Sequence, residues 1–137
     1  ACLVGSEMCI RDRQMIEEGL IDGDPMFQFC LGIPWGAEND PETIEYLKSR
    51  IPENAHWSAF GIGKMQLPTV REVAQRGGNV RVGLEDNIYL RKGVKATNEA
   101  LVEEAKRILA ELDIEPLTPA EAREKFNLRN PHGKGDK

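Results

Sequence analysis

The sequence predicts an α/β fold in which parallel strands alternate with helices. Short apolar segments suited to strands begin near residues 26, 57 and 79, and a helical pattern follows each of them. The strand starts are 31 and 22 residues apart. Both spacings fit a (β/α)8 barrel, in which about 250 residues divide into units of about 31. Right-handed crossovers would make the three strands parallel.

Composition places the chain among proteins with a single hydrophobic core. It has 137 residues, of which 40% are hydrophobic, a size and content typical of one domain. A net charge of -5 argues against a general nucleic-acid binder, and no apolar run approaches the ~20 residues that cross a bilayer. Cys2, Cys9 and Cys30 lack metal-ligand spacing. We therefore expect a cytoplasmic location, with Cys30 as a small buried apolar residue.

The first thirteen residues, ACLVGSEMCIRDR, have no clean helical or strand period. They also lack the basic start and sustained apolar core of a secretory signal. The segment resembles the peptide obtained when sequencing-adapter DNA is translated at the edge of an assembled read. We therefore expect residues 1–13 to be non-native and irregular, with a truncated protein beginning near Gln14. A genuine disordered N-terminus is the alternative.

The elements up to residue 76 follow from apolar runs and helix-start residues. Residues 14–20 predict the tail of a helix, and the nearly continuous apolar run 26–31 predicts a strand covered on both faces. Asp40-Pro41 opens a helix, since Asp40 can accept free amide protons and proline suits the first helical position. A strand from Trp57 enters a glycine-rich loop, and a second helix begins at Pro68.

The third strand is predicted over residues 79–85, after Gly77-Gly78 ends the preceding helix. Its apolar residues alternate with polar ones and with glycine, which is the period of a strand. The apolar residues (Val80, Val82 and Leu84) are expected to pack against helices. The alternate residues, which include Arg81 and Glu85, are expected to face the barrel interior.

The remainder of the chain is predicted to be mostly helical. A loop containing Gly93 precedes a helix over 98–112, whose apolar residues step by four, three and four. Thr118 and Glu121 form a capping box that begins a final helix through about Phe126. The domain is thus expected to span residues 14–128, and residues 129–137 to form a loose tail.

The polar end of the third strand is the strongest candidate for a site. In parallel sheets flanked by helices, chemistry gathers at the carboxyl ends of strands. There Glu85 can bind a divalent metal, and Asp86 can accept a proton under the influence of Arg81. Arg81 and Glu85 would start roughly 13 Å apart along the strand. The alternative is a buried structural ion pair between them, with Asp86 and Asn87 capping the next turn.

Gly61, Gly63 and Lys64 form a second candidate site after the second strand. Glycines at this position let a backbone approach a phosphate, although a simple turn is the favoured interpretation of this pattern. Trp35 either lines the mouth of the site or packs in the ordinary way. His56 precedes its strand, at the end opposite to the site, which indicates a surface role.

Three segments together resemble the beta-keto acid cleavage enzymes, the family of the 3-keto-5-aminohexanoate cleavage enzyme. The segments are FQFCLGIPWG, WSAFGIGKMQLP and GGNVRVGLEDNIYLRKGV, in that order. The likeness covers about residues 14–128. It implies the C-terminal part, about strands six to eight with their helices, of a (β/α)8 barrel.

The resemblance also implies an activity and roles for three residues. Members of the family convert a beta-keto acid and acetyl-CoA to acetoacetate and a new CoA thioester, with zinc held by a His-x-His pair and a glutamate. Glu85 matches that glutamate, and Arg81 and Asp86 match the acid-base pair. Gly61, Gly63 and Lys64 would then approach the CoA phosphates. Homo-oligomeric assembly of the complete enzyme is expected.

Two departures from the family pattern bear on activity. Asn79 stands where many members carry histidine, and this chain contains no His-x-His. The chain alone is therefore expected to be inactive. Two alternatives stay open: another metal-dependent barrel lyase or aldolase that uses the same carboxylates, and a complete, non-enzymatic α/β binding domain. The latter would be a soluble cooperative monomer, whereas a barrel fragment would expose strand edges and associate.

Overall fold

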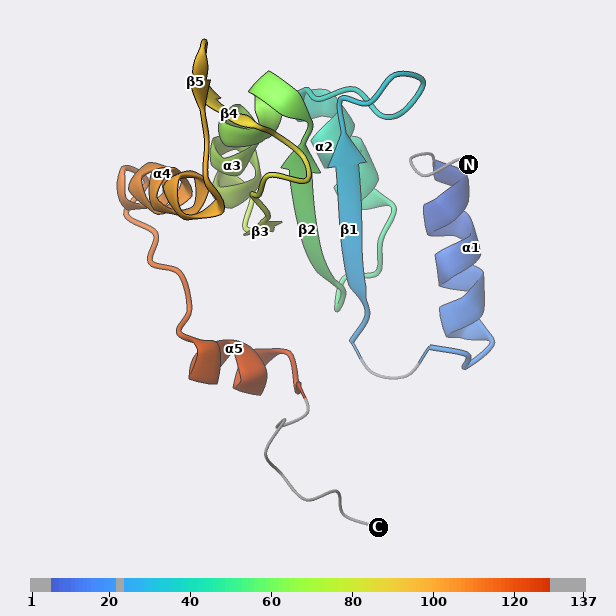
Figure 1. Cartoon of the computed structure of the whole chain (residues 1–137). Coiled ribbons are helices and arrows are strands. Elements are labelled where there is room, and N and C mark those ends of the chain that lie inside the picture. The colour runs from blue at the N-terminus through green and yellow to red at the C-terminus, as the bar shows by residue number, and fades with distance from the viewer. Residues whose placement is uncertain (1–5, 22–23, 129–137) are drawn as a thin grey trace.

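The computed structural model describes residues 6–21 and 24–128, which form a three-stranded sheet, a β-hairpin and flanking helices (Figure 1). The expected loose tail, residues 129–137, lies outside this part of the chain. The elements in chain order are α1 (Ser6–Glu17), β1 (Met26–Leu31), α2 (Pro41–Ser49), β2 (His56–Gly61), the 3-10 helix η1 (Gly63–Met65), α3 (Gln66–Gln75), β3 (Asn79–Val80), β4 (Tyr89–Arg91), β5 (Val94–Lys95), α4 (Asn98–Ala110) and α5 (Pro119–Lys125).

The sheet is parallel, in the order β1-β2-β3, as the alternation of strands and helices predicts. β1 pairs with β2 along its whole length, from Met26 opposite His56 to Leu31 opposite Gly61. β3 pairs with β2 through only two residues. The arrowheads of β1 and β2 point to the same end of the molecule, where the β4–β5 hairpin also lies (Figure 1).

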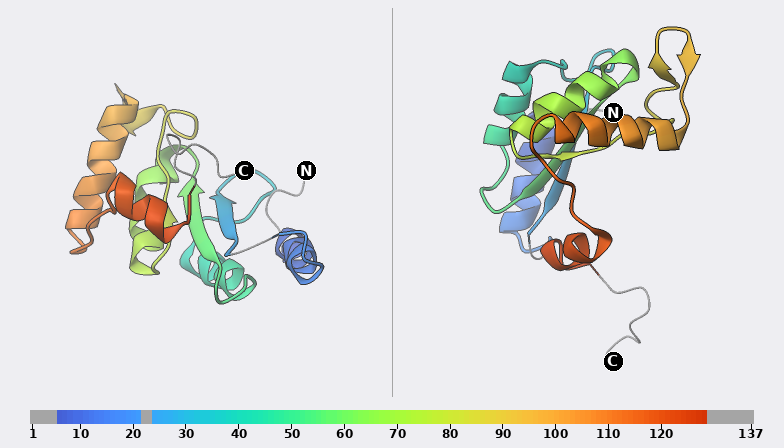
Figure 2. Two further views of the ribbon diagram at one scale, coloured as in Figure 1. Left: turned by 90° about the horizontal axis from the view of Figure 1, so that it is seen from below. Right: turned by 90° about the vertical axis from the view of Figure 1, so that its left-hand side faces the viewer.

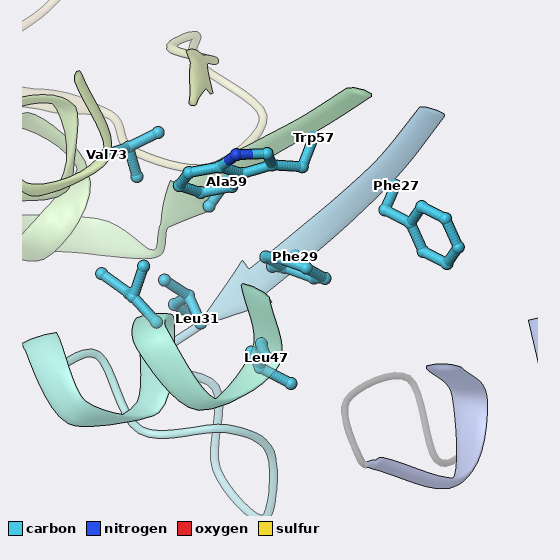
Figure 3. Packing of buried hydrophobic residues seen from close by; sticks show 8 residues of the cluster. Phe27, Phe29, Leu31, Leu47, Trp57, Ala59 and Val73 are labelled. Carbon is cyan, nitrogen blue, oxygen red and sulfur yellow. The ribbon is translucent and has the colours of Figure 1, made fainter. Parts of the chain in front are cut away.

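One face of β1 is covered by the main hydrophobic core. Phe29 and Leu31 lie on the side of β1 that faces α2 (Figure 3), and the Phe29 ring is 5.9 Å from that of Trp57, centroid to centroid. Met26, on the opposite face, is 52% exposed. The expectation that this strand is covered on both faces is therefore wrong. The full core cluster comprises Phe27, Phe29, Leu31, Ile44, Leu47, Trp57, Ala59 and Val73.

A second cluster joins α3 to α4, which lies on the far side of α3 from β2 (Figure 2). Val80 and Val82 pack against this cluster, as predicted from the strand alternation, whereas Leu84 is exposed. The cluster consists of Val70, Ala74, Ala105, Ile108 and Leu109. The predicted capping box of α5 is present, because Thr118 and Glu121 bond reciprocally at its first turn.

Three local predictions differ from the structure. α1 begins at Ser6, so the expected irregularity is wrong for residues 6–13; residues 1–5 lie outside the described part, and the foreign origin of residues 1–13 stays a prediction. A hairpin, β4–β5, replaces the expected loop around Gly93. β3 ends at Val80 instead of residue 85. No helix within residues 6–21 and 24–128 combines the length and apolarity needed to cross a bilayer.

Candidate functional site

The chain leaves the sheet after Val80 and turns back over residues 84–86. The backbone N–H groups of Asp86 and Asn87 both donate to the Gly83 carbonyl at 3.2 Å. That carbonyl also accepts from the side-chain amide of Gln66 at 2.9 Å, which occupies an acceptor that a longer strand would offer to the ladder. The polar residues that follow β3 thus turn toward one another instead of extending the strand.

The turn lies at the carboxyl end of the parallel strands, where a site is predicted. Gly63, just after β2, donates its N–H to the Asp86 carbonyl at 2.7 Å. Ile62 likewise donates to the carbonyl of Leu31 at 3.2 Å, which ties the ends of β1 and β2 together. The acidic residues thus lie at the end of the sheet where these two strands emerge.

Arg81 binds Asp86 through two atoms of its guanidinium. Its Nε donates to Oδ2 of Asp86 at 3.0 Å, and its Nη2 donates to Oδ1 at 3.2 Å. The Asp86 side chain is only 5% exposed. The guanidinium also lies over the ring of Phe60, 4.2 Å from its centroid, a distance suited to a cation–π contact. These contacts hold the buried carboxylate in one orientation.

Glu85 shares the same guanidinium but lies in solvent. Its Oε2 accepts from Nη2 of Arg81 at 2.8 Å, and its side chain is 83% exposed. Glu85 and Arg81 are therefore in direct contact, although residues 81–85 do not form the predicted strand. The ion pair that we considered as an alternative exists, but its buried partner is Asp86. Asn87 closes the next turn, as that alternative expects, since its amide bonds both the N–H and the carbonyl of Tyr89.

Cys30 belongs to the surroundings of this pair, which sequence reasoning missed. It lies opposite Phe60 in the register of β1 and β2, so both residues share the face that carries Arg81. Burial raises the pKa of the Cys30 thiol, the charge of Asp86 raises it further, and Arg81 partly opposes both. The thiol is therefore neutral near pH 7. The sequence does contain a signal for this position. Side chains alternate along a strand, so Cys30 faces away from Phe29 and Leu31.

The glycines after β2 have different surroundings. Gly61 is the last residue of β2, and a Cβ there would collide with the side chains of Asn39 and Thr69 and lie 2.8 Å from the Met65 carbonyl. Close packing is therefore sufficient reason for glycine at this position. Gly63 has a φ of 59°, and a Cβ there would meet open space. Approach of a phosphate to Gly61, Gly63 and Lys64 stays a prediction.

A pocket of about 810 Å³ opens beside the turn. It is lined by Gly63, Lys64 and Leu67 on one side and by the continuous stretch 84–93 on the other. Asp86 therefore borders a space large enough for a small molecule. Of the two candidate glycines, Gly63 borders the pocket.

The described residues do not make a zinc site on their own. Within 6–21 and 24–128, no three His, Cys, Asp or Glu residues gather closely enough to hold a metal. Glu85 offers one carboxylate, and its Oε1 accepts no hydrogen bond from the described residues. Any zinc ion bound here would need its other ligands from elsewhere.

Trp35 and His56 contribute nothing to this site. The Trp35 side chain is fully exposed, so it neither packs in a core nor lines the pocket. His56 begins β2, at the opposite end of the strand from the pocket. Its ring stands edge-on to that of Phe126 at 4.9 Å, centroid to centroid.

Comparison with known proteins gives a consistent family. The chain is 42% identical over 116 residues to the 3-dehydrocarnitine:acetyl-CoA trimethylamine transferase of Rhizobium meliloti (strain 1021), covering 85% of this chain and 39% of the relative. It is 34% identical over 134 residues to the 3-keto-5-aminohexanoate cleavage enzyme of Fusobacterium nucleatum, covering 92% and 48%. It is 35% identical over 118 residues to the 3-oxoadipate:acetyl-CoA acetyltransferase of Cupriavidus necator, covering 83% and 42%.

The chain thus spans less than half the length of these relatives. Their names describe enzymes, and two of the three include acetyl-CoA. The sequence profile of the beta-keto acid cleavage enzymes matches residues 5–128, nearly the whole chain. The parallel sheet and the segments that suggested the resemblance both fall within that match. The chain therefore belongs to the beta-keto acid cleavage enzyme family.

Proposed function

We propose that this chain is the C-terminal part, about strands six to eight, of a (β/α)8-barrel enzyme. The enzyme would convert a beta-keto acid and acetyl-CoA to acetoacetate and a new CoA thioester. The observation that carries the proposal is the buried Asp86 carboxylate, held by Arg81 at the carboxyl end of a parallel sheet and bordering a pocket. The names of the relatives support acetyl-CoA as the co-substrate.

Asp86 is the proposed proton acceptor and Arg81 its positioning partner. A general base must be held within hydrogen-bond reach of the proton that it removes. The two-atom contact with Arg81 and the low exposure of Asp86 provide that fixed position. The neutral Cys30 thiol adds no competing charge on this face. Asp86 would take a proton from the reacting substrate and return it after the carbon–carbon bond changes.

Glu85 is the proposed zinc ligand of the complete enzyme, with the other ligands supplied from outside the described residues. Its exposure and its available Oε1 support this role. Zinc would polarise the keto group of the substrate. The metal content of the complete enzyme tests this role: Glu85→Ala should lower bound zinc, and unchanged zinc would refute it. A cytoplasmic location and homo-oligomeric assembly stay predictions.

A chimera tests the proposed activity. Residues 14–128 would replace the matching C-terminal region of the Rhizobium meliloti relative, and acetyl-CoA-dependent acetoacetate formation would be measured with a panel of beta-keto acids. The chimera should be active, and Asp86→Asn should lower kcat by about 10²–10⁴-fold, the usual contribution of a general base. Full activity of Asp86→Asn would contradict the assigned role. The matched substitution Asp113→Asn, on the loop after α4, should leave activity unchanged.

A further inference from the structure

Gln66 is a buried polar residue beside the candidate site that does not line its pocket. It is the first residue of α3 and is fully buried, although glutamine is mostly exposed in proteins. It is absent from the residues that border the pocket next to Asp86. Within 6–21 and 24–128, its Oε1 accepts no hydrogen bond, so burying this amide costs free energy. A specific contact of the other amide atom, Nε2, is the reason to look for a role.

The Nε2 group of Gln66 donates to the Gly83 carbonyl at 2.9 Å. The same carbonyl accepts from the backbone N–H groups of Asp86 and Asn87, each at 3.2 Å. The bond from Gln66 is the shortest of the three, and the other two come from the turn itself. Gln66 therefore attaches the turn that carries Asp86 to the first turn of α3.

The ion pair of Arg81 and Asp86 needs such an attachment to hold its place in the molecule. Both residues belong to the segment that follows β3, so their contact orients each side chain relative to the other. Contacts from elsewhere in the chain come from the ring of Phe60, the N–H of Gly63 and the amide of Gln66. Of these, the bonds from Gly63 and Gln66 restrain the backbone of the turn.

Asn98 makes a further contact with the turn, but in solvent. Its Oδ1 accepts the N–H of Leu84 at 2.9 Å, and both residues are exposed. Water can replace an exposed acceptor when it is removed, so the net value of this bond is small. Gln66 is fully buried, and its bond is the one whose loss should displace the turn.

We infer that Gln66 is a positioning residue of the enzyme: its amide fixes the Gly83 carbonyl and thereby holds the Asp86 carboxylate where it accepts the proton of the substrate. The inference rests on the proposed function and deepens it, because it gives a role to a residue outside the pocket. A general base must lie within hydrogen-bond reach of the proton. A small displacement of the turn therefore reduces the rate of the reaction more than it reduces substrate binding.

The substitution Gln66→Met in the chimera tests this role. Methionine is similar in length and volume but cannot donate, and it also removes the buried Oε1, so the urea midpoint should stay within about 0.5 M of the parent. The value of kcat should fall by about 10–100-fold, whereas the KM for each substrate should change by less than about twofold. In the Asp86→Asn background, the same substitution should lower kcat by less than about twofold, because its effect depends on Asp86.

Two control variants belong to this experiment. Gln75→Met places the same side chain at the exposed end of α3 and should leave kcat unchanged. Asn98→Ala removes the exposed acceptor of the turn and should lower kcat less than Gln66→Met does.

Hydrogen–deuterium exchange of the 137-residue chain gives a second measurement that needs no activity. Gln66→Met should speed exchange of the Asp86 and Asn87 amides by about fivefold or more, because the carbonyl that accepts them is no longer held. The amides of β1 should exchange as they do in the parent. Gln75→Met should leave both sets of amides unchanged.

Four results would overturn the inference. They are parental kcat in an active Gln66→Met chimera, an equal loss of kcat with and without the Asp86 carboxylate, parental exchange at Asp86 and Asn87, and faster exchange that extends through β1. The last result would make Gln66 a support of the whole fold. Failure of the proposed function is distinguishable, because an inactive parent chimera would refute the activity, while faster exchange confined to the turn would still support the attachment by Gln66.

Discussion

Arg81 binds two carboxylates that are adjacent in sequence but differ greatly in exposure. The Asp86 side chain is 5% exposed and contacts the guanidinium through both oxygens, whereas Glu85 is 83% exposed and uses one. Water screens the charge of Glu85, so its attraction to Arg81 is weak. Removing Arg81 would instead leave the Asp86 charge buried without a partner. The stability of this region therefore depends on the Asp86 contact.

Double-mutant cycles should show this difference. We expect a coupling free energy of about 2 kcal/mol between Arg81→Gln and Asp86→Asn, in the range measured for contacting residues. For Arg81→Gln and Glu85→Gln we expect less than about 1 kcal/mol. Urea unfolding of the four proteins in each cycle gives both values. Equal coupling in the two cycles would contradict the assignment of Asp86 as the main partner.

Gly61 should tolerate no side chain. Its missing Cβ leaves room for a chain of hydrogen bonds in which Asn39 donates to Thr69 at 2.6 Å and Thr69 donates to the Met65 carbonyl at 2.7 Å. We expect Gly61→Ala to lower the free energy of unfolding by about 1–3 kcal/mol, as overpacked cores do. Urea unfolding measures the change.

Gly83→Ala is the control for this substitution. A Cβ at Gly83 would lie 3.5 Å from Oδ1 of Asn98, an ordinary contact, and we expect stability within about 0.5 kcal/mol of the parent. If Gly61→Ala were equally harmless, the strand end would be more adaptable than its contacts indicate. A role for Gly61 in ligand approach would then regain importance.

The helices begin at residues that the sequence identifies from local chemistry. Asp40 accepts the backbone N–H of Thr43 at 2.9 Å and its hydroxyl at 2.7 Å, at the start of α2. Thr97 similarly accepts the N–H of Ala100 at the start of α4. Such caps involve residues three positions apart, so a sequence pattern is enough to predict them.

The cap of α2 should make stability depend on pH. The backbone N–H of Thr43, and then its hydroxyl, lower the pKa of Asp40 below its ordinary value of 3.8. Because the folded state favours the ionised carboxylate, this stabilisation is complete above 3.8 and is lost as pH falls through the lower folded pKa. Asp40→Asn, which can still accept the Thr43 N–H, should lose less stability than the parent as the pH falls from about 5 to about 2.

Urea unfolding across this pH range checks the prediction. Asp113→Asn serves as the control, since Asp113 lies in the turn after α4 with a backbone φ of 56°, which asparagine also adopts readily. If Asp40→Asn and the parent lost stability equally at low pH, the charge of the Asp40 carboxylate would contribute nothing to the free energy of unfolding. The helix would then depend on packing of Ile44 and Leu47 alone.

The elements that the sequence missed depend on contacts between distant segments. Beyond the end of β3 at Val80, the Gln66 amide donates to the carbonyl of Gly83 from 17 positions away. No local period reports such a contact. The hairpin was more accessible to prediction, because Lys92-Gly93 between short β-forming segments is a turn pattern that permits it. The sequence was enough to predict that Arg81 and Asp86 lie at the carboxyl end of the sheet. The alternation of residues 79–82 indicated the face on which Arg81 lies.

At the scale of the whole molecule, the described sheet has an incompletely covered side. β1 is the outer strand, and Met26 and Gln28 are exposed on the face opposite to the main core. Free strand edges promote association, and natural proteins oppose it with charged residues. We therefore expect the 137-residue chain to self-associate as its concentration rises, in line with a barrel fragment.

A lysine on this face should reduce association. We expect Gln28→Lys to shift the chain toward monomer, because pairing would then bury a charge. Gln75→Lys, an exposed position at the end of α3, is the matched control and should leave the association state unchanged. Size-exclusion chromatography with light scattering over a concentration series measures the effect. A cooperative monomer at all concentrations would instead support an independently folded domain.

The one-sided burial of β1 also determines which substitutions a stability screen can detect. Changes at Phe29 or Leu31 remove contacts with α2 and will register in any unfolding assay of this chain. Changes at Met26 or Gln28 touch little in the described structure and will pass such a screen as neutral. In the proposed barrel, their cost would appear only when neighbouring strands close around them, so selection for a more stable 137-residue chain would accumulate variants that no longer fit the complete barrel.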